Sequence, residues 1–216
     1  SLTVRSLIDA LADSLRERVF TELTPGALVG ESEVSRKYEV ARPTAKAAIE
    51  RLVQEGLLRR DAHRSARVPV IGSEDAEDLY FTRSCLESEV MRRLATTATV
   101  PDTAEQAIRE LAAAATGRGL SNLVEPDIRF HRTLVDALGS PRLSRMHAGI
   151  MGEMRLCMVQ VQAHHLLDPA VIVAEHTDIL KAIADGAAND ASAVLVAHLD
   201  RARALLTNDL RSPGDS

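Results

Sequence analysis

The residues best suited to chemistry in this chain are one aspartate and three histidines from three separate segments. Asp127 and His131 are four positions apart, so on an α-helix they lie on the same side, one turn from each other. His176 and His198 each sit within a helical pattern of their own. If these three helices met, one carboxylate and three imidazoles would face a common point, a ligand set suited to zinc, nickel or a related divalent ion.

Each of these residues also has an ordinary interpretation. An Asp/His pair at i, i+4 on a helix is often a surface hydrogen bond, and a single helical histidine is often a partly buried polar residue. The residue types and their spacing leave both interpretations open.

The composition favours packed helices over sheets. Apolar residues make up 45% of the 216 positions, whereas aromatic residues make up 2% and tryptophan is absent. Ala, Leu and Val therefore supply most of the apolar side chains, and the length suffices for one domain or two small ones. Cys85 and Cys157 show neither a zinc spacing nor a disulfide framework, so we expect two reduced core residues.

The sequence also predicts a cytoplasmic protein with no membrane partner. No apolar run approaches the roughly 20 residues that span a bilayer. No charged segment followed by an apolar one opens the sequence as a leader would.

The net charge of −5 is unevenly distributed along the chain. Residues 1–72 contain twelve Lys/Arg and ten Asp/Glu, whereas residues 73–216 contain fourteen and twenty-one. Within residues 36–67 the count is nine basic to four acidic. A basic segment on an acidic body is typical of nucleic-acid binding at one end, although a solvated helix face would give the same charges.

Residues 1–72 are predicted to form a winged helix-turn-helix domain. The first helix is indicated by apolar residues at four-residue steps, namely Leu7, Leu11, Leu15, Val19 and Leu23. Two further helices are expected over residues 31–38 and 43–55, and Gly56 closes the second of them. The helix that starts near Pro43 would enter the major groove of DNA.

The wing is expected to follow that helix directly. Leu57-Leu58 and residues 68–70 read as two short strands, with the basic hairpin 59–67 between them. Such a hairpin would lie along the DNA backbone or in the minor groove.

Residues 73–216 are predicted to form an all-α antiparallel bundle of six helices. Proline and glycine breaks separate the spans 74–97, 101–117, 121–138, 141–165, 168–185 and 189–209. The interior of such a bundle is a natural place for a ligand held by inward-facing side chains.

The N-terminal residues resemble a known family. The segment from Leu23 to Leu28, the helix 31–38 and the segment from Arg42 to Leu57 are similar to the DNA-binding domain of GntR-type bacterial transcription regulators. The resemblance implies a set of DNA contacts from the recognition helix and the wing tip: Arg42, Thr44, Lys46, His63 and Arg64. Arg42 is best suited to a guanine edge, because its planar fork can pair with it in two places.

Two departures from the GntR pattern concern the start of the recognition helix. Ala41 stands where the family usually has a capping serine, and Pro43-Thr44 inverts the usual order of those two residues. Because alanine cannot cap a helix, the register of the residues near Arg42 is not fixed by the resemblance.

The remaining residues resemble the FCD effector domain of the FadR branch of these regulators. The similarity rests on residues 80–87, 127–134, 175–176 and 198–203. In metal-binding members of that branch, the corresponding Asp and three His bind a divalent metal near the effector cavity. The resemblance therefore implies a zinc or nickel site made by Asp127, His131, His176 and His198.

Arg83 is a candidate ligand for a small carboxylate effector. Its guanidinium could make a bidentate pair with a carboxylate bound at the metal. It could equally form a salt bridge to Glu87, which lies four residues further along the same helix.

These observations together predict a homodimeric transcription regulator, acting as a repressor on a double-stranded operator and controlled by a small organic acid. Two alternatives stay open: the metal ion itself is the signal, or it only braces the bundle. A metal-dependent hydrolase is less favoured, because the chain has no His-Glu-x-x-His motif, no adjacent His-Asp pair and no recognisable activated nucleophile.

Overall fold

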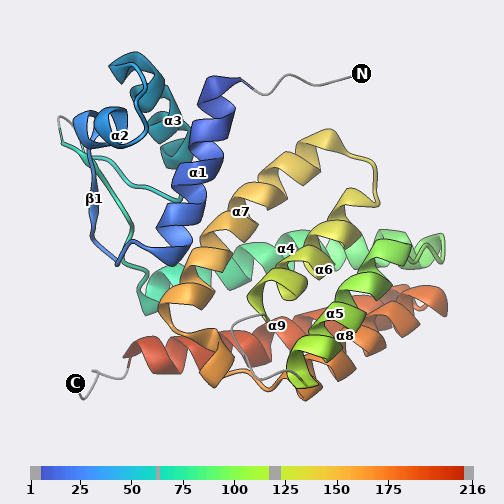
Figure 1. Cartoon of the computed structure of the whole chain (residues 1–216). Helices are drawn as coiled ribbons and strands as arrows, with labels where there is room; N and C mark the ends of the chain where they lie inside the picture. The colour runs from blue at the N-terminus through green and yellow to red at the C-terminus, as the bar shows by residue number, and fades with distance from the viewer. Residues whose placement is uncertain (1–5, 62–63, 117–122, 212–216) are drawn as a thin grey trace. The chain divides into compact units, whose positions relative to one another are not determined.

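The computed structural model describes residues 6–61, 64–116 and 123–211. It divides into two compact units, one that ends at Ile71 and one that begins at Gly72. Figure 1 shows the helices and strands of each unit.

The first unit is built on three helices, as the sequence predicts. They are α1 (Leu7–Thr21), α2 (Glu31–Lys37) and α3 (Arg42–Gln54). The four-residue steps of α1 place Leu11, Leu15 and Val19 in the core, and α3 contributes four buried residues of its own. The first helical residue of α3 is Arg42, one residue before the expected start at Pro43.

The expected strands at Leu57-Leu58 and 68–70 are wrong. Instead β1 (Leu28–Val29) pairs antiparallel with β2 (Ala66–Arg67), and a single bridge joins Arg59 to Arg67. The Leu57-Leu58 pair is buried, but both amides donate to the carbonyl of Leu52 in the last turn of α3, at 3.0 and 3.2 Å. These amides therefore close the helix, and the left-handed backbone of Gly56 (φ 74°) makes that closure possible.

The second unit consists of packed helices. In the described residues they are α4 (Ser73–Thr96), α5 (Asp102–Thr116), α6 (Val124–Asp136), α7 (Pro141–Gln160), α8 (Pro169–Ala184) and α9 (Ala188–Arg211). The two longest, α4 and α9, pack against each other, and α8 packs against both (Figure 1). The predicted mainly helical fold, a winged helix-turn-helix followed by a helical bundle, is confirmed.

The starts of α7 and α8 follow from local side-chain chemistry. The Ser140 hydroxyl accepts a hydrogen bond from the Leu143 amide, and the Asp168 carboxylate accepts one from the Ala170 amide. In each case a proline at the next position fits the first turn, where its missing N–H is not needed.

Two finer expectations are wrong. The helix expected over 141–165 ends at Gln160, because Gln162 adopts a left-handed backbone (φ 48°) and the short 3-10 helix η2 (Ala163–His165) follows. Cys85 is exposed on the outer face of α4, whereas Cys157 is buried as expected, and burial raises the pKa of its thiol to about 12.

Among the residues that the structure describes, no helix combines the length and the apolar character needed to cross a membrane.

Candidate metal centre

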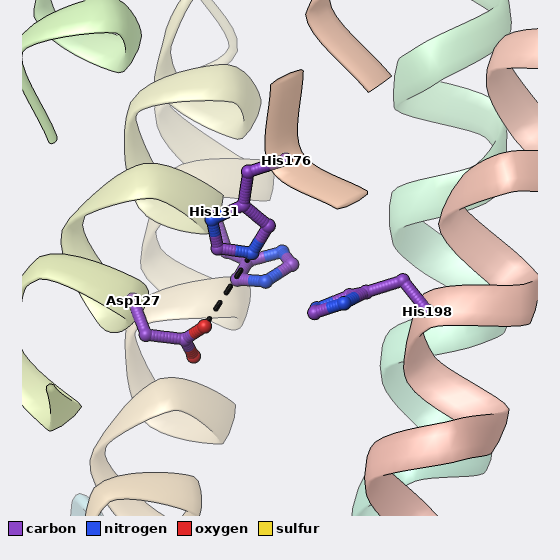
Figure 2. Close-up of side chains that lie close together, drawn as sticks. All are labelled: Asp127, His131, His176 and His198. Atoms are coloured by element: carbon purple, nitrogen blue, oxygen red, sulfur yellow. Dashed lines mark ion pairs between the residues drawn. The ribbon is translucent and has the colours of Figure 1, made fainter. Parts of the chain in front are cut away.

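The aspartate and three histidines singled out from the sequence meet inside the second unit. Asp127 and His131 come from α6, His176 from α8 and His198 from α9, and Figure 2 shows them pointing toward one another. One ligand atom from each lies within 4.8 Å of all the others. All four side chains are buried, with at most 5% of any residue exposed.

The amphipathic pattern of α6 explains how two of these groups enter the core. Phe130 and Leu134 on the same helix are fully buried, so that face of α6 is turned inward. Asp127 and His131 lie one turn apart beside them, as the four-residue spacing predicts. The helix that supplies the apolar core therefore also delivers the polar pair.

Glu87 on α4 fixes the orientation of His131. Its Oε2 lies 2.7 Å from Nδ1 of His131, and its Oε1 lies 2.9 Å from Nε of Arg83 and 3.0 Å from Nε2 of His147. Burial alone would raise the pKa of Glu87, but Arg83 and the two imidazoles outweigh it and hold that pKa well below its usual range. Glu87 is therefore a carboxylate that accepts hydrogen bonds on both oxygens.

Glu175 on α8 fixes the orientation of His198 in the same way. Its Oε2 lies 2.7 Å from Nδ1 of His198, and Arg201 clamps both oxygens at 2.5 Å. Burial would raise the pKa of Glu175, but the hydrogen bonds from His198 and Arg201 lower it to about 2. With Nδ1 occupied, Nε2 is the nitrogen of His198 that remains for another partner.

His176 is held by packing rather than by a carboxylate. Its ring stacks on Phe130 with centroids 3.9 Å apart and planes 8° from parallel. Neither ring nitrogen has a hydrogen-bond partner, although Nε2 lies 3.4 Å from Oδ1 of Asp127 (Figure 2). Burial, followed by the charges of His198, His131 and Arg83, lowers the pKa of His176 well below 6.5, so the ring is neutral at pH 7.

The unpartnered nitrogens match the requirements of a metal site. Nε2 of His131 and both nitrogens of His176 are buried without a hydrogen bond, and each such group costs roughly 1–3 kcal/mol. At the usual zinc–nitrogen distance of about 2.1 Å, neighbouring ligand atoms lie roughly 3–3.4 Å apart, so the four ligand atoms, which lie within 4.8 Å of one another, would move closer together around an ion. The donor set, one carboxylate and three imidazoles, is also of the right type for a divalent ion.

Arg83 forms the ion pair with Glu87 that one of its two sequence interpretations predicts. Both side chains are fully buried. The same guanidinium leaves Nη2 buried without a partner. One edge of Arg83 is therefore committed to Glu87, while one N–H group stays available for an acceptor.

The candidate DNA contacts lie on the surface of the first unit. Arg42 and Lys46 are exposed on α3, Thr44 is half-buried between them, and Arg64 is exposed beside β2. His63 lies outside the described residues. The exposed arginine and lysine side chains of Arg42, Lys46 and Arg64 have no carboxylate partner within the described ranges.

Other basic residues of this unit are engaged within the protein. Carboxylates of the same unit pair with Arg16, Arg18, Arg51 and Arg60. The ion pairs thus separate arginines that hold the fold from cations that face solvent, a distinction that charge counting could not make.

Sequence reasoning missed Glu87, His147 and Glu175 as parts of the site. Glu87 appeared only as a local partner of Arg83, and His147 matched no pattern. Their contacts join residues 44 and 60 positions apart, which a helical spacing cannot indicate. Glu175 directly precedes His176, and the sequence indicated it only as part of the segment 175–176 of the family resemblance.

Comparison with known families agrees with both halves of this description. The model for bacterial regulatory proteins of the gntR family matches residues 7–68, and the FCD domain model matches residues 78–201.

Individual proteins similar to this chain are also described as transcription regulators. The HTH-type transcriptional repressor RspR of Escherichia coli is 25% identical over 174 residues, or 78% of this chain and 74% of RspR. The regulator BphR of Paraburkholderia xenovorans is 33% identical over 91 residues, which are 42% of this chain and only 37% of BphR. A crystal structure of a GntR regulator from Rhodococcus sp. RHA1 shares the fold, with a TM-score of 0.83, 22% identity, and coverage of 94% of this chain and 99% of that one.

Proposed function

Because the chain belongs to the gntR family of bacterial regulatory proteins and carries an FCD domain, it is a DNA-binding transcription regulator and not an enzyme, and we propose that a metal-centred effector site controls its operator binding. In this proposal Asp127, His131, His176 and His198 hold one divalent ion, and a small carboxylate is the signal. The protein would act as a homodimer in the cytoplasm.

The observation that carries the proposal is the convergence of four buried ligand groups, two of which, His131 and His176, have ring nitrogens without a hydrogen-bond partner. Imidazole and carboxylate ligands suit zinc and nickel among the available divalent ions. A bound ion would supply a Lewis-acidic centre, and an ion with five or six coordination positions could take an oxygen donor beyond the four protein ligands. The chain's own contribution is to hold the ligands in place, two of them through Glu87 and Glu175.

The charge balance of the site favours an anionic effector. Arg83 and Arg201 supply two positive charges, whereas Glu87, Glu175 and Asp127 supply three negative ones. With neutral imidazoles, the cluster therefore has one net negative charge, and a divalent ion would turn it into one net positive charge. A carboxylate would neutralise that charge and could accept from Nη2 of Arg83, the buried donor that lacks a partner.

We propose that α3 and the wing bind the operator. Arg42 stands at the first position of α3, where side chains of a recognition helix reach base edges, and its fork suits guanine. Thr44 and Lys46 would contact the backbone beside it, and the wing would add His63 and Arg64. A homodimer would place two such modules on two half-sites related by a two-fold axis.

Control by the effector requires that the carboxylate and DNA prefer different arrangements of the protein. Arg83 and Glu87, which lie beside the proposed ligands, belong to α4, and the first residue of α4, Ser73, follows the end of the first unit almost directly. A change in α4 on binding would therefore reach the DNA-binding unit through the chain itself. Since the relative RspR is a repressor, we propose that the effector releases the operator.

The test measures operator binding with the metal and the acid varied separately. A duplex selected from a random pool by the zinc-loaded full chain is labelled for fluorescence anisotropy, and acetate, succinate and citrate are titrated with and without zinc. We expect at least one acid to weaken binding only when zinc is present, and Asp127→Asn to abolish that response. Operator binding that follows the zinc concentration and ignores every acid would instead make the ion the signal.

A further inference from the structure

We propose that Glu87 is a positioning residue that selects the tautomer of His131 and so makes Nε2 of His131 the metal-binding atom. The inference rests on the metal site proposed above and adds to it a residue from α4, a helix that supplies none of the four ligands. Glu87 would not touch the ion, because its two oxygens are engaged by Arg83, His131 and His147.

The first step is the chemistry of an ionised carboxylate. Such a group has no proton and can only accept hydrogen bonds, and Glu87 is held in that form by the adjacent guanidinium of Arg83. Nδ1 of His131, 2.7 Å from Oε2, must therefore carry the proton. In a neutral imidazole the other nitrogen then has the lone pair, and Nε2 of His131 is the nitrogen that is buried without a partner.

The second step is that the contact is fixed from several sides. Oε1 of Glu87 accepts from Arg83 on the same helix and from His147 on α7, and all four side chains of this group are buried. The carboxylate cannot rotate away from His131 without breaking those contacts. The orientation of the His131 ring is therefore set by α4 and α7 before any ion arrives.

The third step is that the same arrangement occurs independently at a second ligand. Glu175 accepts from Nδ1 of His198 at 2.7 Å and is itself clamped by Arg201. Metal-binding histidines commonly donate their other N–H to a carboxylate in this way, and the loss of such a partner typically weakens metal binding by about 10- to 100-fold. His176 has no equivalent, because its Nδ1 is unpartnered.

Replacement of Glu87 by glutamine turns this geometry into a test. If the amide oxygen stays opposite Arg83 and His147, both of which donate to it, the amide NH2 must face Nδ1 of His131. That nitrogen would then have to accept, and the proton would move to Nε2. The reverse orientation of the amide places its NH2 against the Nε–H of Arg83, where two donors meet, so it is disfavoured.

The experiment reads the tautomer directly in metal-free protein. The full chain is labelled with 15N-histidine and treated with a chelator. Two-bond 1H–15N correlation spectra are recorded at pH 8, and the His131 signals are assigned by their loss in His131→Gln. We expect a protonated Nδ1 and an unprotonated Nε2 in the wild type. A proton on Nε2 in the wild type would overturn the inference without the need for a variant that folds.

The variants then test the consequence. We expect E87Q to move the proton to Nε2 and to weaken zinc binding by about 10- to 100-fold in a competition titration with a chromophoric chelator. E89Q makes the same chemical change on the same helix at a half-exposed residue that pairs only with Arg92 and Arg93 among the described residues. It should leave both measurements at their wild-type values. An unchanged tautomer and unchanged zinc affinity in E87Q would overturn the inference.

The two readouts also separate this inference from the proposed function. If wild-type protein failed to bind zinc, the metal-centred function would be refuted whatever the tautomer. The spectra would still decide on Glu87: a proton that moves in E87Q supports its hold on His131, and a proton that stays overturns it.

Discussion

Replacement of His176 by phenylalanine should make the metal-free protein more stable. It should also remove most of the stabilisation that zinc gives to the wild type. The imidazole is fully buried, and neither of its nitrogens has a hydrogen-bond partner. A phenyl ring in its place would keep the stack on Phe130 and would remove both unsatisfied groups. His176 is therefore a residue that lowers stability in the absence of an ion, as functional sites often do.

The magnitude follows from two opposing contributions. Two buried unpaired polar groups cost roughly 2–6 kcal/mol together, and the larger six-membered ring costs about 1–3 kcal/mol through overpacking. We expect a net gain of about 1–3 kcal/mol for metal-free H176F, which corresponds to an increase in Tm of roughly 2–12 °C for a protein of this size. At free zinc a hundredfold above its Kd, the wild type should gain about 2.7 kcal/mol, whereas H176F should gain almost nothing.

Thermal unfolding followed by circular dichroism, once with a chelator and once with zinc, measures both effects. His165→Phe is the matched control, because it makes the same chemical change at an exposed position outside the four proposed ligands and should leave the stabilisation by zinc at its wild-type value. A metal-free H176F that is less stable than the wild type would show that the two nitrogens are satisfied in solution. Zinc stabilisation of H176F equal to that of the wild type would show that His176 is not a ligand.

Three further predictions concern DNA, the effector and pH. Arg42→Ala should weaken operator binding by about 1–3 kcal/mol, roughly 5- to 150-fold, because it removes a guanine-binding fork; an unchanged anisotropy titration would refute that placement. Arg83→Lys keeps a cation beside Glu87 but lacks Nη2. Calorimetry with the acid found in the operator assay should therefore show weaker binding of that acid, while zinc binding persists. An acid affinity equal to that of the wild type would exclude Arg83 as the partner of the acid. Burial lowers the pKa of His176 in the folded protein well below 6.5, so as the pH falls His176 is protonated in the unfolded chain before it is protonated in the folded one. The free energy of unfolding of the metal-free protein should therefore decrease as the pH falls through about 6.5. Equal urea midpoints at pH 5.5 and 7.5 would contradict this.

The helices were predictable because their ends carry local chemical signals. Pro141 and Pro169 follow capping residues, and glycines follow α3, α6 and α8, so their boundaries lie within a few residues of the expected ones. The end of α7 was missed because Gln162 takes a left-handed backbone without being glycine or asparagine. The strand at Leu57-Leu58 was misassigned because a buried apolar pair looks the same in a strand and in a helix-closing turn.

The site was predictable only in part for a similar reason. The spacing of Asp127 and His131 and the family resemblance were enough to expect the four side chains that the structure brings together. Spacing could not reveal that Glu87 joins α4, α6 and α7, because those contacts depend on how the helices pack. Residue types therefore indicated which groups could bind an ion, whereas the packing determines which nitrogen of each ring is free to do so.

The most direct test of the metal-centred regulator is the metal content of the full chain purified without a histidine tag. We expect mass spectrometry to find about one zinc or nickel ion per chain, and chelated protein to take up one zinc ion again in a titration that Asp127→Asn weakens. The absence of any stoichiometric metal, together with no zinc binding by the chelated protein, would contradict the assignment of Asp127, His131, His176 and His198 as ligands.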